Sequence, residues 1–335
     1  MCRINILKIL CTLLIMKKYL TIIVCLLISS ALASACRPRL AGATPASGSS
    51  LDVLAAESFL ADIAQNVAGD RLIVGTLLPL GLDPHAFEPT PRDVAKIVDS
   101  NIFIVNGAGL EKWLANILES AGGQRLVIDA SAGLIPKHRP AGGIVCGPPT
   151  QAGVEENSGG GDPHFWLDPV LVIRYVENIR DGLSQADPQA RDLYVRNAEA
   201  YISRLKELDV WIAGQVAQIP PEQRLLVTNH ESLGYFADRY GFKLVGAILP
   251  SFSTAASPSA GELARLADCI RSSGTPAIFL ETGANPQLAD QLAQETGIRI
   301  VTELYTHSIT PPDGNAPDYI SMMKYNTQAI VGALK

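Results

Sequence analysis

From Leu51 to the C-terminus, short apolar runs alternate with amphipathic stretches, and this alternation constrains the fold more than any other feature. Runs typical of buried strands occupy residues 71–78 and 102–105. A helix start lies between them, with Thr90 as N-cap and Pro91 at the first position. A second helical pattern covers residues 110–120. Strands that alternate with helices build mainly parallel sheets covered by helices. We therefore predict an α/β fold.

One long helical pattern, over residues 188–220, interrupts this alternation and ends at Pro220-Pro221. The alternation then resumes, with strands predicted at 224–228, 243–249, 277–280 and 298–301, and helices at 233–240, 258–272, 286–296 and 319–334. We predict two βα lobes, residues 51–187 and 221–335, joined by a long rigid helix over 188–220. Open α/β sheets bind ligands at the carboxyl ends of their strands, so the cleft between the lobes is the expected site.

The first 50 residues have the pattern of an export signal. Met16-Lys17-Lys18 precedes an apolar run from Tyr19 to Ile28, which is too short to span a bilayer comfortably. Small residues then lead into Cys36, as at a bacterial lipoprotein cleavage site; ordinary cleavage near Ala35 is the alternative. We predict a signal peptide over 1–35, a flexible tether over 36–50 and a lipid anchor on Cys36. The protein would then be exported, and held at the periplasmic or cell-surface side of a membrane.

Charge and cysteine content narrow the function further. The net charge of −6 argues against nucleic acid as a partner, because nucleic-acid binding calls for a basic surface. Beyond the leader and Cys36, the chain holds only Cys146 and Cys269. In an exported protein these two can form a disulfide, but Cys269 lies in a helical pattern and burial as a free thiol is equally compatible with the sequence.

The histidines are the strongest indication of chemistry. Asp-Pro-His occurs twice, at residues 83–85 and 162–164, in a chain with five histidines. Four of the five fall at strand-to-helix connections or loop ends, two in each predicted lobe: His85, His164, His230 and His307. Converging imidazoles suit zinc and other late transition metals. We predict a metal site made of these four side chains, with His138 apart from it in a loop.

Several carboxylates are placed to support such a site. Asp83 and Asp162 belong to the two Asp-Pro-His turns, and Glu88 and Asp168 follow them closely. Any of these can accept the second ring proton of a histidine and so fix its tautomer.

The motifs resemble those of the solute-binding proteins of bacterial ABC importers that carry zinc and manganese, a group that includes metal-binding surface lipoproteins. The resemblance implies two lobes joined by one rigid helix, a metal between them, no enzymatic turnover, a membrane permease as partner, and a monomer. The matching segments are residues 81–90, 106–113, 162–169, 229–237 and 319–326.

Carried over residue by residue, the resemblance makes His85 and His164 the ligands from the N-terminal lobe and His230 the third ligand. The manganese branch often has glutamate at the third position, so histidine favours zinc. The family usually places an aspartate ligand where this chain has His307, in Tyr305-Thr306-His307-Ser308.

Three arrangements follow for the fourth ligand: His307 ligates, water replaces it, or Glu281 supplies a carboxylate. We favour His307, which gives a closed four-nitrogen site for Zn²⁺ that would also accept Cu²⁺ or Ni²⁺, with Mn²⁺ as the remaining alternative.

Two other functions are compatible with the sequence. An exported zinc-dependent hydrolase would need an open metal position and a base such as Glu231 or Glu281. The pair His230-Glu231 resembles part of a zinc-protease motif, but Gly234 stands where its second histidine belongs. A surface adhesin stabilised by the metal is the other alternative. We expect an importer component rather than an enzyme, with Glu281, Asp83, Asp162 and Glu231 as alternative ligands or as acceptors behind the histidines.

Overall fold

The computed structural model describes residues 51–122, 124–138 and 161–335. The predicted signal peptide and tether, Cys36 and Cys146 lie outside the described residues.

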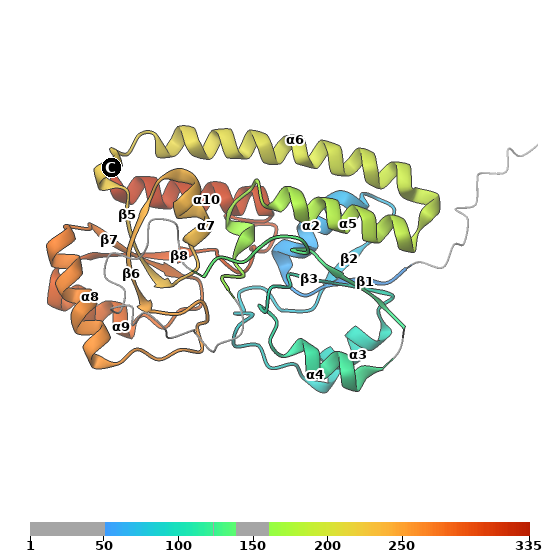
Figure 1. The fold of residues 1–335 in the computed structure, drawn as a ribbon, viewed down its shortest axis with the longest axis horizontal. Coiled ribbons are helices and arrows are strands. Elements are labelled where there is room, and N and C mark those ends of the chain that lie inside the picture. The colour runs from blue at the N-terminus through green and yellow to red at the C-terminus, as the bar shows by residue number, and fades with distance from the viewer. Residues whose placement is uncertain (1–50, 123, 139–160) are drawn as a thin grey trace, which may run out of the picture. The chain divides into compact units, whose positions relative to one another are not determined.

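The N-terminal lobe is built on a four-stranded parallel sheet (Figure 1). Its strands are β1 (Val53–Ala55), β2 (Val74–Thr76), β3 (Ile102–Val105) and β4 (Leu126–Asp129), in the order β2-β1-β3-β4. Its helices are α2 (Ser58–Ala68), α3 (Pro91–Asp99) and α4 (Leu114–Ala121), and α5 (Val172–Ala186) packs against β4 and α2. Helix α3 begins as predicted, with a capping box between Thr90 and Asp93.

The C-terminal lobe repeats this plan. Strands β5 (Leu225–His230), β6 (Lys243–Leu249), β7 (Ala277–Glu281) and β8 (Arg299–Leu304) pair in parallel in the order β6-β5-β7-β8. Helices α7 (Gly234–Tyr240), α8 (Ala260–Ser273), α9 (Gln287–Thr296) and α10 (Tyr319–Leu334) connect and cover them. In both lobes the first and third strands, β1 and β3 or β5 and β7, are neighbours, and successive strands are added outward from them on opposite sides. The predicted α/β class with mainly parallel sheets is confirmed.

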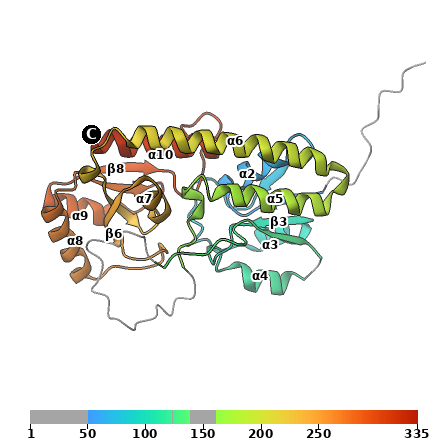
Figure 2. The same cartoon turned by 45° about the horizontal axis from the view of Figure 1, so that its top comes forward.

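The long helix α6 (Arg191–Val216) runs past both lobes, as Figures 1 and 2 show from two directions. It packs against α2 and α5 of the N-terminal lobe and against α7 and α10. Its buried residues recur at intervals of three or four, which is the helical period: Tyr194, Ala198, Tyr201, Leu205, Leu208, Ile212 and Val216. The helix that joins the lobes is therefore observed as predicted, preceded by the short 3-10 turn η2 (Pro188–Ala190).

Some local predictions were wrong or incomplete. The sequence Asp168-Pro169 is typical of a helix start, but α5 begins only at Val172, and the 3-10 turn η1 (Phe165–Leu167) precedes Asp168. The Asp168 carboxylate instead accepts the backbone N–H of Val170 at 2.8 Å. His230 is the last residue of β5 and does not follow it. Strands β1 and β4 are not among the predicted elements, since strands of three or four residues give little periodic signal. Helix α2 is missing from the prediction as well.

One hydrophobic cluster contains buried residues of both lobes, and each lobe also has a smaller cluster of its own. Trp166, on η1, is fully buried and stacks on Phe59 of α2 with ring centroids 4.6 Å apart. Its ring Nε1 donates to the carbonyl of Thr306 at 2.6 Å, and its backbone carbonyl accepts the hydroxyl of Tyr319 at 2.7 Å. Through its ring and its backbone, one residue thus joins the N-terminal lobe to the loop after β8 and to α10.

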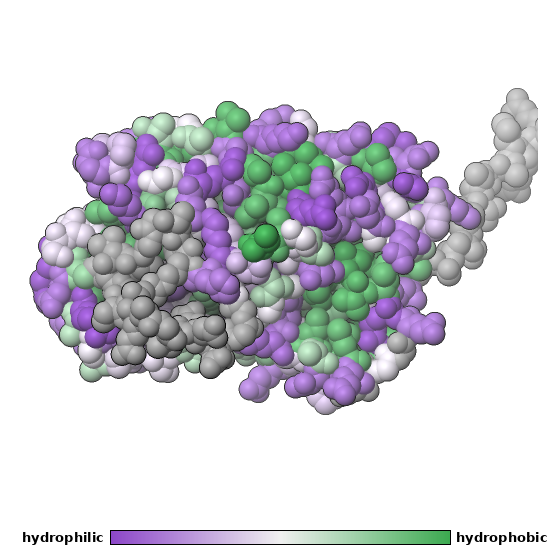
Figure 3. All heavy atoms as spheres, in the orientation of Figure 1, coloured by the Kyte–Doolittle hydropathy of each residue, from purple (hydrophilic) through white to green (hydrophobic). Residues whose placement is uncertain are grey.

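On the face in Figure 3, a green apolar area lies over the N-terminal lobe. Among the described residues, the exposed large apolar side chains are Ile73, Leu80, Leu82, Val98, Val127 and Ile135 of this lobe and Val210 of α6. No helix in the part of the chain that the structure describes has the length and hydropathy to cross a membrane.

Cys269 on α8 takes part in a disulfide bond. The other five cysteines lie outside the described residues, so its pairing with Cys146 stays a prediction.

Two buried carboxyl groups lie beyond the ends of β1 and β3, the neighbouring strands between which the strand order of the N-terminal sheet reverses. Glu57 follows β1, and Glu111 accepts the backbone N–H groups of Asn106 and Gly107, just after β3, at 2.5 and 3.1 Å. Burial and the neighbouring Glu111 raise the pKa of Glu57 well above its ordinary value. Burial also raises the pKa of Glu111, to about 7, against the hydrogen bonds that lower it. At neutral pH this pair holds a proton that an unfolded chain would release.

We expect the Glu57→Gln variant to lose less stability than the wild type as the pH rises. A carboxyl group with a raised pKa favours the folded state below its unfolded pKa, and this contribution is lost as the pH rises through the folded value. The stability of the metal-free wild type should therefore fall from pH 6 to pH 8.5, by on the order of 1 kcal/mol, and less in the variant, whose amide cannot ionise. Urea unfolding at both pH values measures this. Glu119→Gln, an exposed change on α4, is the control, and equal losses in all three proteins would contradict the expectation.

Candidate metal centre

The two Asp-Pro-His segments form the same turn. The backbone N–H of His85 donates to Oδ1 of Asp83 at 2.9 Å, and that of His164 donates to Oδ1 of Asp162 at 2.9 Å. An aspartate that accepts the N–H two residues on closes a tight turn, and the intervening proline stiffens it. Each segment therefore holds one imidazole in a defined direction. This is the physical reason for the repeated motif.

The C-terminal lobe supplies the other two histidines. His230 ends β5, and His307 lies three residues after the end of β8. The segment after His307 is held against the N-terminal lobe, because the Ser308 hydroxyl accepts the backbone N–H of Gly81 at 2.9 Å and lies 3.1 Å from the hydroxyl of Ser58.

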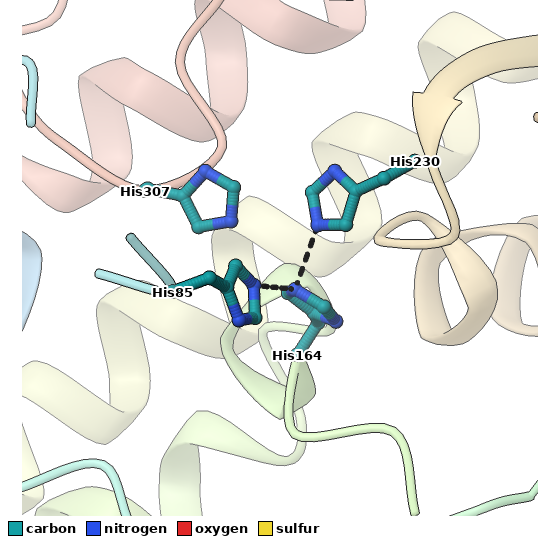
Figure 4. A group of neighbouring side chains, drawn as sticks. All are labelled: His85, His164, His230 and His307. Carbon is teal, nitrogen blue, oxygen red and sulfur yellow. Dashed lines mark hydrogen bonds between the residues drawn. The ribbon is translucent and has the colours of Figure 1, made fainter. Parts of the chain in front are cut away.

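The four imidazoles converge on one point, as Figure 4 shows. One nitrogen from each of His85, His164, His230 and His307 lies within 4.8 Å of the corresponding nitrogen of every other. Nε2 of His164 is 3.1 Å from Nε2 of His85 and 3.1 Å from Nε2 of His230. Tetrahedral zinc with Zn–N bonds of about 2.0–2.1 Å places its ligand nitrogens about 3.3 Å apart. The spacing thus fits a small cation at the centre.

The carboxylates beside these rings also indicate a cation site, because they favour particular positions for the ring protons. Nδ1 of His164 lies 2.7 Å from Oδ1 of Asp162, and Nδ1 of His230 lies 2.7 Å from Oε1 of Glu281. A proton on each Nδ1 leaves a lone pair on each Nε2. Two lone pairs 3.1 Å apart repel each other unless a cation lies between them. Nε2 of His307 is also buried without a hydrogen-bond partner among the described residues.

Burial keeps three of these rings neutral. It lowers the pKa of His85, His164 and His307, and repulsion between the imidazoles adds to the effect at His85 and His164. Neutral imidazole is the form that binds a metal. The centre is therefore held in the state that accepts a cation.

Two carboxylates stand behind the histidines. Burial raises the pKa of Asp162 well above its ordinary value, which makes it a stronger acceptor for the Nδ1 proton of His164. Burial acts in the same direction on Glu281, but His230 and His307 outweigh it and hold the pKa of Glu281 at about 2. Glu281 therefore carries a fixed negative charge beside the two C-terminal histidines.

The remaining sequence candidates lie elsewhere. Asp83 was expected to face a histidine ring, but it accepts a backbone N–H of its own turn and the hydroxyl of Thr254 from the other lobe. Asp168 pairs with Arg239 at 3.3 Å, and Glu88 is exposed. Glu231 is half-buried, its backbone N–H donates to the Ser251 carbonyl at 3.0 Å, and His138 is exposed outside the cluster.

The structure adds two hydroxyl groups that the motif pattern had not indicated. Ser232 donates to Oε1 of Glu281 at 3.0 Å, and the Thr306 hydroxyl lies 3.0 Å from Nδ1 of His307. Both residues are neighbours of a histidine in the sequence. Only that proximity pointed to them, because serine and threonine are common in loops.

Comparison with known proteins agrees with this geometry. Residues 53–333 match the model of the family described as zinc-uptake complex component A, periplasmic (ZnuA). The chain belongs to this family. The match includes both sheets, α6 and all four histidines.

Individual relatives are named for different metals. The chain is 35% identical over 291 residues to the manganese-binding lipoprotein MntA of Halalkalibacterium halodurans, covering 87% of this chain and 91% of that protein. It is 32% identical over 273 residues to the iron-binding protein YfeA of Yersinia pestis, covering 82% and 83%. The solved structure of the periplasmic zinc-binding protein TroA from Treponema pallidum superposes with a TM-score of 0.74 at 26% identity, covering 85% of this chain and 99% of that one.

Family and fold together decide the class of function. The chain is a periplasmic, metal-binding component of an ABC importer, which implies a membrane permease as its partner. It is a substrate-binding protein rather than an enzyme, so the hydrolase alternative is set aside. Its extracytoplasmic location agrees with the export signal predicted from the sequence.

We expect Asp162→Asn to weaken metal binding by about 10–100-fold, because an acceptor behind a metal-binding histidine typically contributes that much. The amide no longer attracts the Nδ1 proton of His164 as the carboxylate does, so Nε2 is free to take it. Chelator competition with Zn²⁺ measures the change. Asp70→Asn, an exposed site in the same lobe, should bind as the wild type does, and an unchanged affinity in Asp162→Asn would contradict the role of this contact.

Proposed function

We propose that this protein captures Zn²⁺ between its lobes through Nε2 of His85, His164, His230 and His307 and delivers it to the permease of an ABC importer. The observation that carries the proposal is the set of four imidazoles whose ring nitrogens face one another within 4.8 Å. A closed four-ligand tetrahedral site suits tight capture of a cargo ion, and separation of the lobes would release it.

The donor set supports zinc over manganese. Nitrogen ligands suit zinc, copper and nickel, whereas manganese is better served by carboxylate oxygens. The names of the relatives include manganese, iron and zinc, so they leave the metal open. Glu281 contacts the far sides of two histidine rings, which favours His307 rather than Glu281 as the fourth ligand.

We expect the chain without its leader to bind one Zn²⁺ tightly, with Mn²⁺ excluded and with Cu²⁺ and Ni²⁺ as competitors. His307→Ala should weaken zinc binding, and His307→Asp should shift the preference toward Mn²⁺, because a carboxylate then replaces a nitrogen. Chelator competition with each metal measures both. His138→Ala removes a histidine outside the cluster and is the matched control. If every metal binds weakly to the wild type, the proposed function is wrong.

We also propose that lipid on Cys36 anchors the mature protein, that residues 188–220 join lobes of residues 51–187 and 221–335, and that the protein works as a monomer. The small residues before Cys36 support the first point, and relatives such as MntA are named as lipoproteins.

The lipid anchor predicts where a cysteine variant will be found. Cys36→Ala should move the protein from the membrane fraction to the soluble fraction after cell lysis. The variant lacks the lipid chain, whose burial in the bilayer stabilises membrane binding by about 0.8 kcal/mol per CH₂ group. Immunoblots of the two fractions measure this. An unchanged distribution would show that Cys36 carries no anchor.

A further inference from the structure

Glu281 lies at a special position in the C-terminal sheet. Its strand, β7, pairs in parallel with β5 on one side and with β8 on the other. His230 ends β5, and His307 follows β8. A side chain at the carboxyl end of the middle strand can therefore reach both histidines.

Both carboxylate oxygens of Glu281 are used in this way. Oε1 lies 2.7 Å from Nδ1 of His230, and Oε2 lies 3.4 Å from Nδ1 of His307. The hydroxyl of Ser232 donates to Oε1 at 3.0 Å and so fixes the carboxylate. The carboxylate is buried, with 5% of its side chain exposed, so water does not compete for these contacts.

The Thr306 hydroxyl completes the arrangement around His307. It lies 3.0 Å from Nδ1 of His307 and also hydrogen-bonds to Glu281. A carboxylate accepts and cannot donate, so the hydroxyl proton of Thr306 goes to Glu281. The Thr306 oxygen is then free to accept from Nδ1 of His307. Through Thr306, and through its negative charge 3.4 Å from Nδ1, Glu281 favours the proton of His307 on Nδ1.

The N-terminal lobe is built differently. There His164 has its own acceptor, Asp162, two residues away in the same turn, at 2.7 Å from its Nδ1. In the C-terminal lobe one carboxylate serves two imidazoles, one at the end of β5 and one in the loop after β8. A single side chain therefore controls half of the nitrogen ligands.

We propose that Glu281 is a positioning residue that sets the tautomer of His230 and His307 together, and that it thereby selects cations with high affinity for imidazole over Mn²⁺. The inference rests on the proposed function for its second part, since it concerns the same centre. With both protons on Nδ1, the Nε2 lone pairs of both rings face the cation. Glu281 therefore raises the affinity most for those cations that bind imidazole nitrogen most strongly.

The Glu281→Gln variant separates this role from a general one. An amide has one acceptor oxygen and one donor nitrogen, so it can accept the Nδ1 proton of only one histidine. The other ring then faces a donor and must move its proton to Nε2, where it blocks the metal. Glu295→Gln, an exposed change on α9 of the same lobe, removes the same charge without contact to a histidine of the cluster and is the control.

The first measurement is the tautomer of each ring in the metal-free mature protein, from long-range ¹H–¹⁵N correlation spectra. In the wild type and in Glu295→Gln, we expect His230 and His307 to carry their protons on Nδ1. In Glu281→Gln, one of the two should change to the Nε2-protonated form. If either histidine of the wild type carries its proton on Nε2, the inference is wrong even if the variant does not fold.

The second measurement is the ratio of Zn²⁺ to Mn²⁺ affinity by chelator competition. Glu281→Gln should lose about 10–100-fold in zinc affinity and less in manganese affinity. In a His307→Ala background the same change should cost less zinc affinity, because only His230 remains to be positioned; strict additivity of the two changes would overturn the shared role. If the wild type binds no metal, the proposed function fails, whereas an unchanged tautomer in Glu281→Gln overturns only this inference.

Discussion

The structure depends first on the packing around Trp166, which lies in the hydrophobic cluster that both lobes share. Its ring stacks on Phe59 of α2 and donates to the Thr306 carbonyl, and its backbone carbonyl accepts the hydroxyl of Tyr319. Thr306 and His307 are adjacent, and His164 lies two residues before Trp166. The contact that joins the lobes is therefore also the contact that sets one histidine of each lobe at its place. Packed cores change between discrete arrangements rather than deform continuously. Separation of the lobes would therefore break this contact as a whole and carry His164 and His307 apart, since each belongs to a different lobe.

The positions of the protons on the histidine rings decide whether the candidate centre can bind a metal ion. Burial lowers the pKa of His85, His164 and His307, so these rings bring no charge of their own. Carboxylate oxygens lie 2.7 Å from Nδ1 of His164 and from Nδ1 of His230, which favours protons there and lone pairs at the centre. Glu281 also supplies negative charge near the candidate cation site. Without a cation, the lone pairs of His164 and His230 face each other at 3.1 Å, an arrangement that favours metal capture.

The two lobes use the same strand order for different purposes. In the C-terminal lobe, the ends of β5 and β7 carry His230 and Glu281, so the point where the chain reverses direction across the sheet forms part of the metal centre. In the N-terminal lobe the equivalent point, after β1 and β3, holds the buried pair of Glu57 and Glu111 instead. Its histidines come from the two Asp-Pro-His turns. The same strand order thus positions a candidate ligand, His230, in one lobe and a buried protonated carboxyl pair in the other, because different side chains follow the strands.

The sequence by itself determined the α/β class and the long helix between two lobes, and it indicated an export signal and the four histidines of the candidate centre. These features are local: strand and helix periods, a leader, and an aspartate that closes a turn two residues before a histidine. It also indicated the contact between Asp162 and His164, because the two are neighbours. It could not show that Asp83 reaches Thr254 of the other lobe, or that Glu281 stands behind His230 and His307 while His307 faces the centre. Those contacts depend on the register of β5, β7 and β8 and on the packing of the lobes around Trp166, which bring together residues far apart in the chain, so only the tertiary structure decided them.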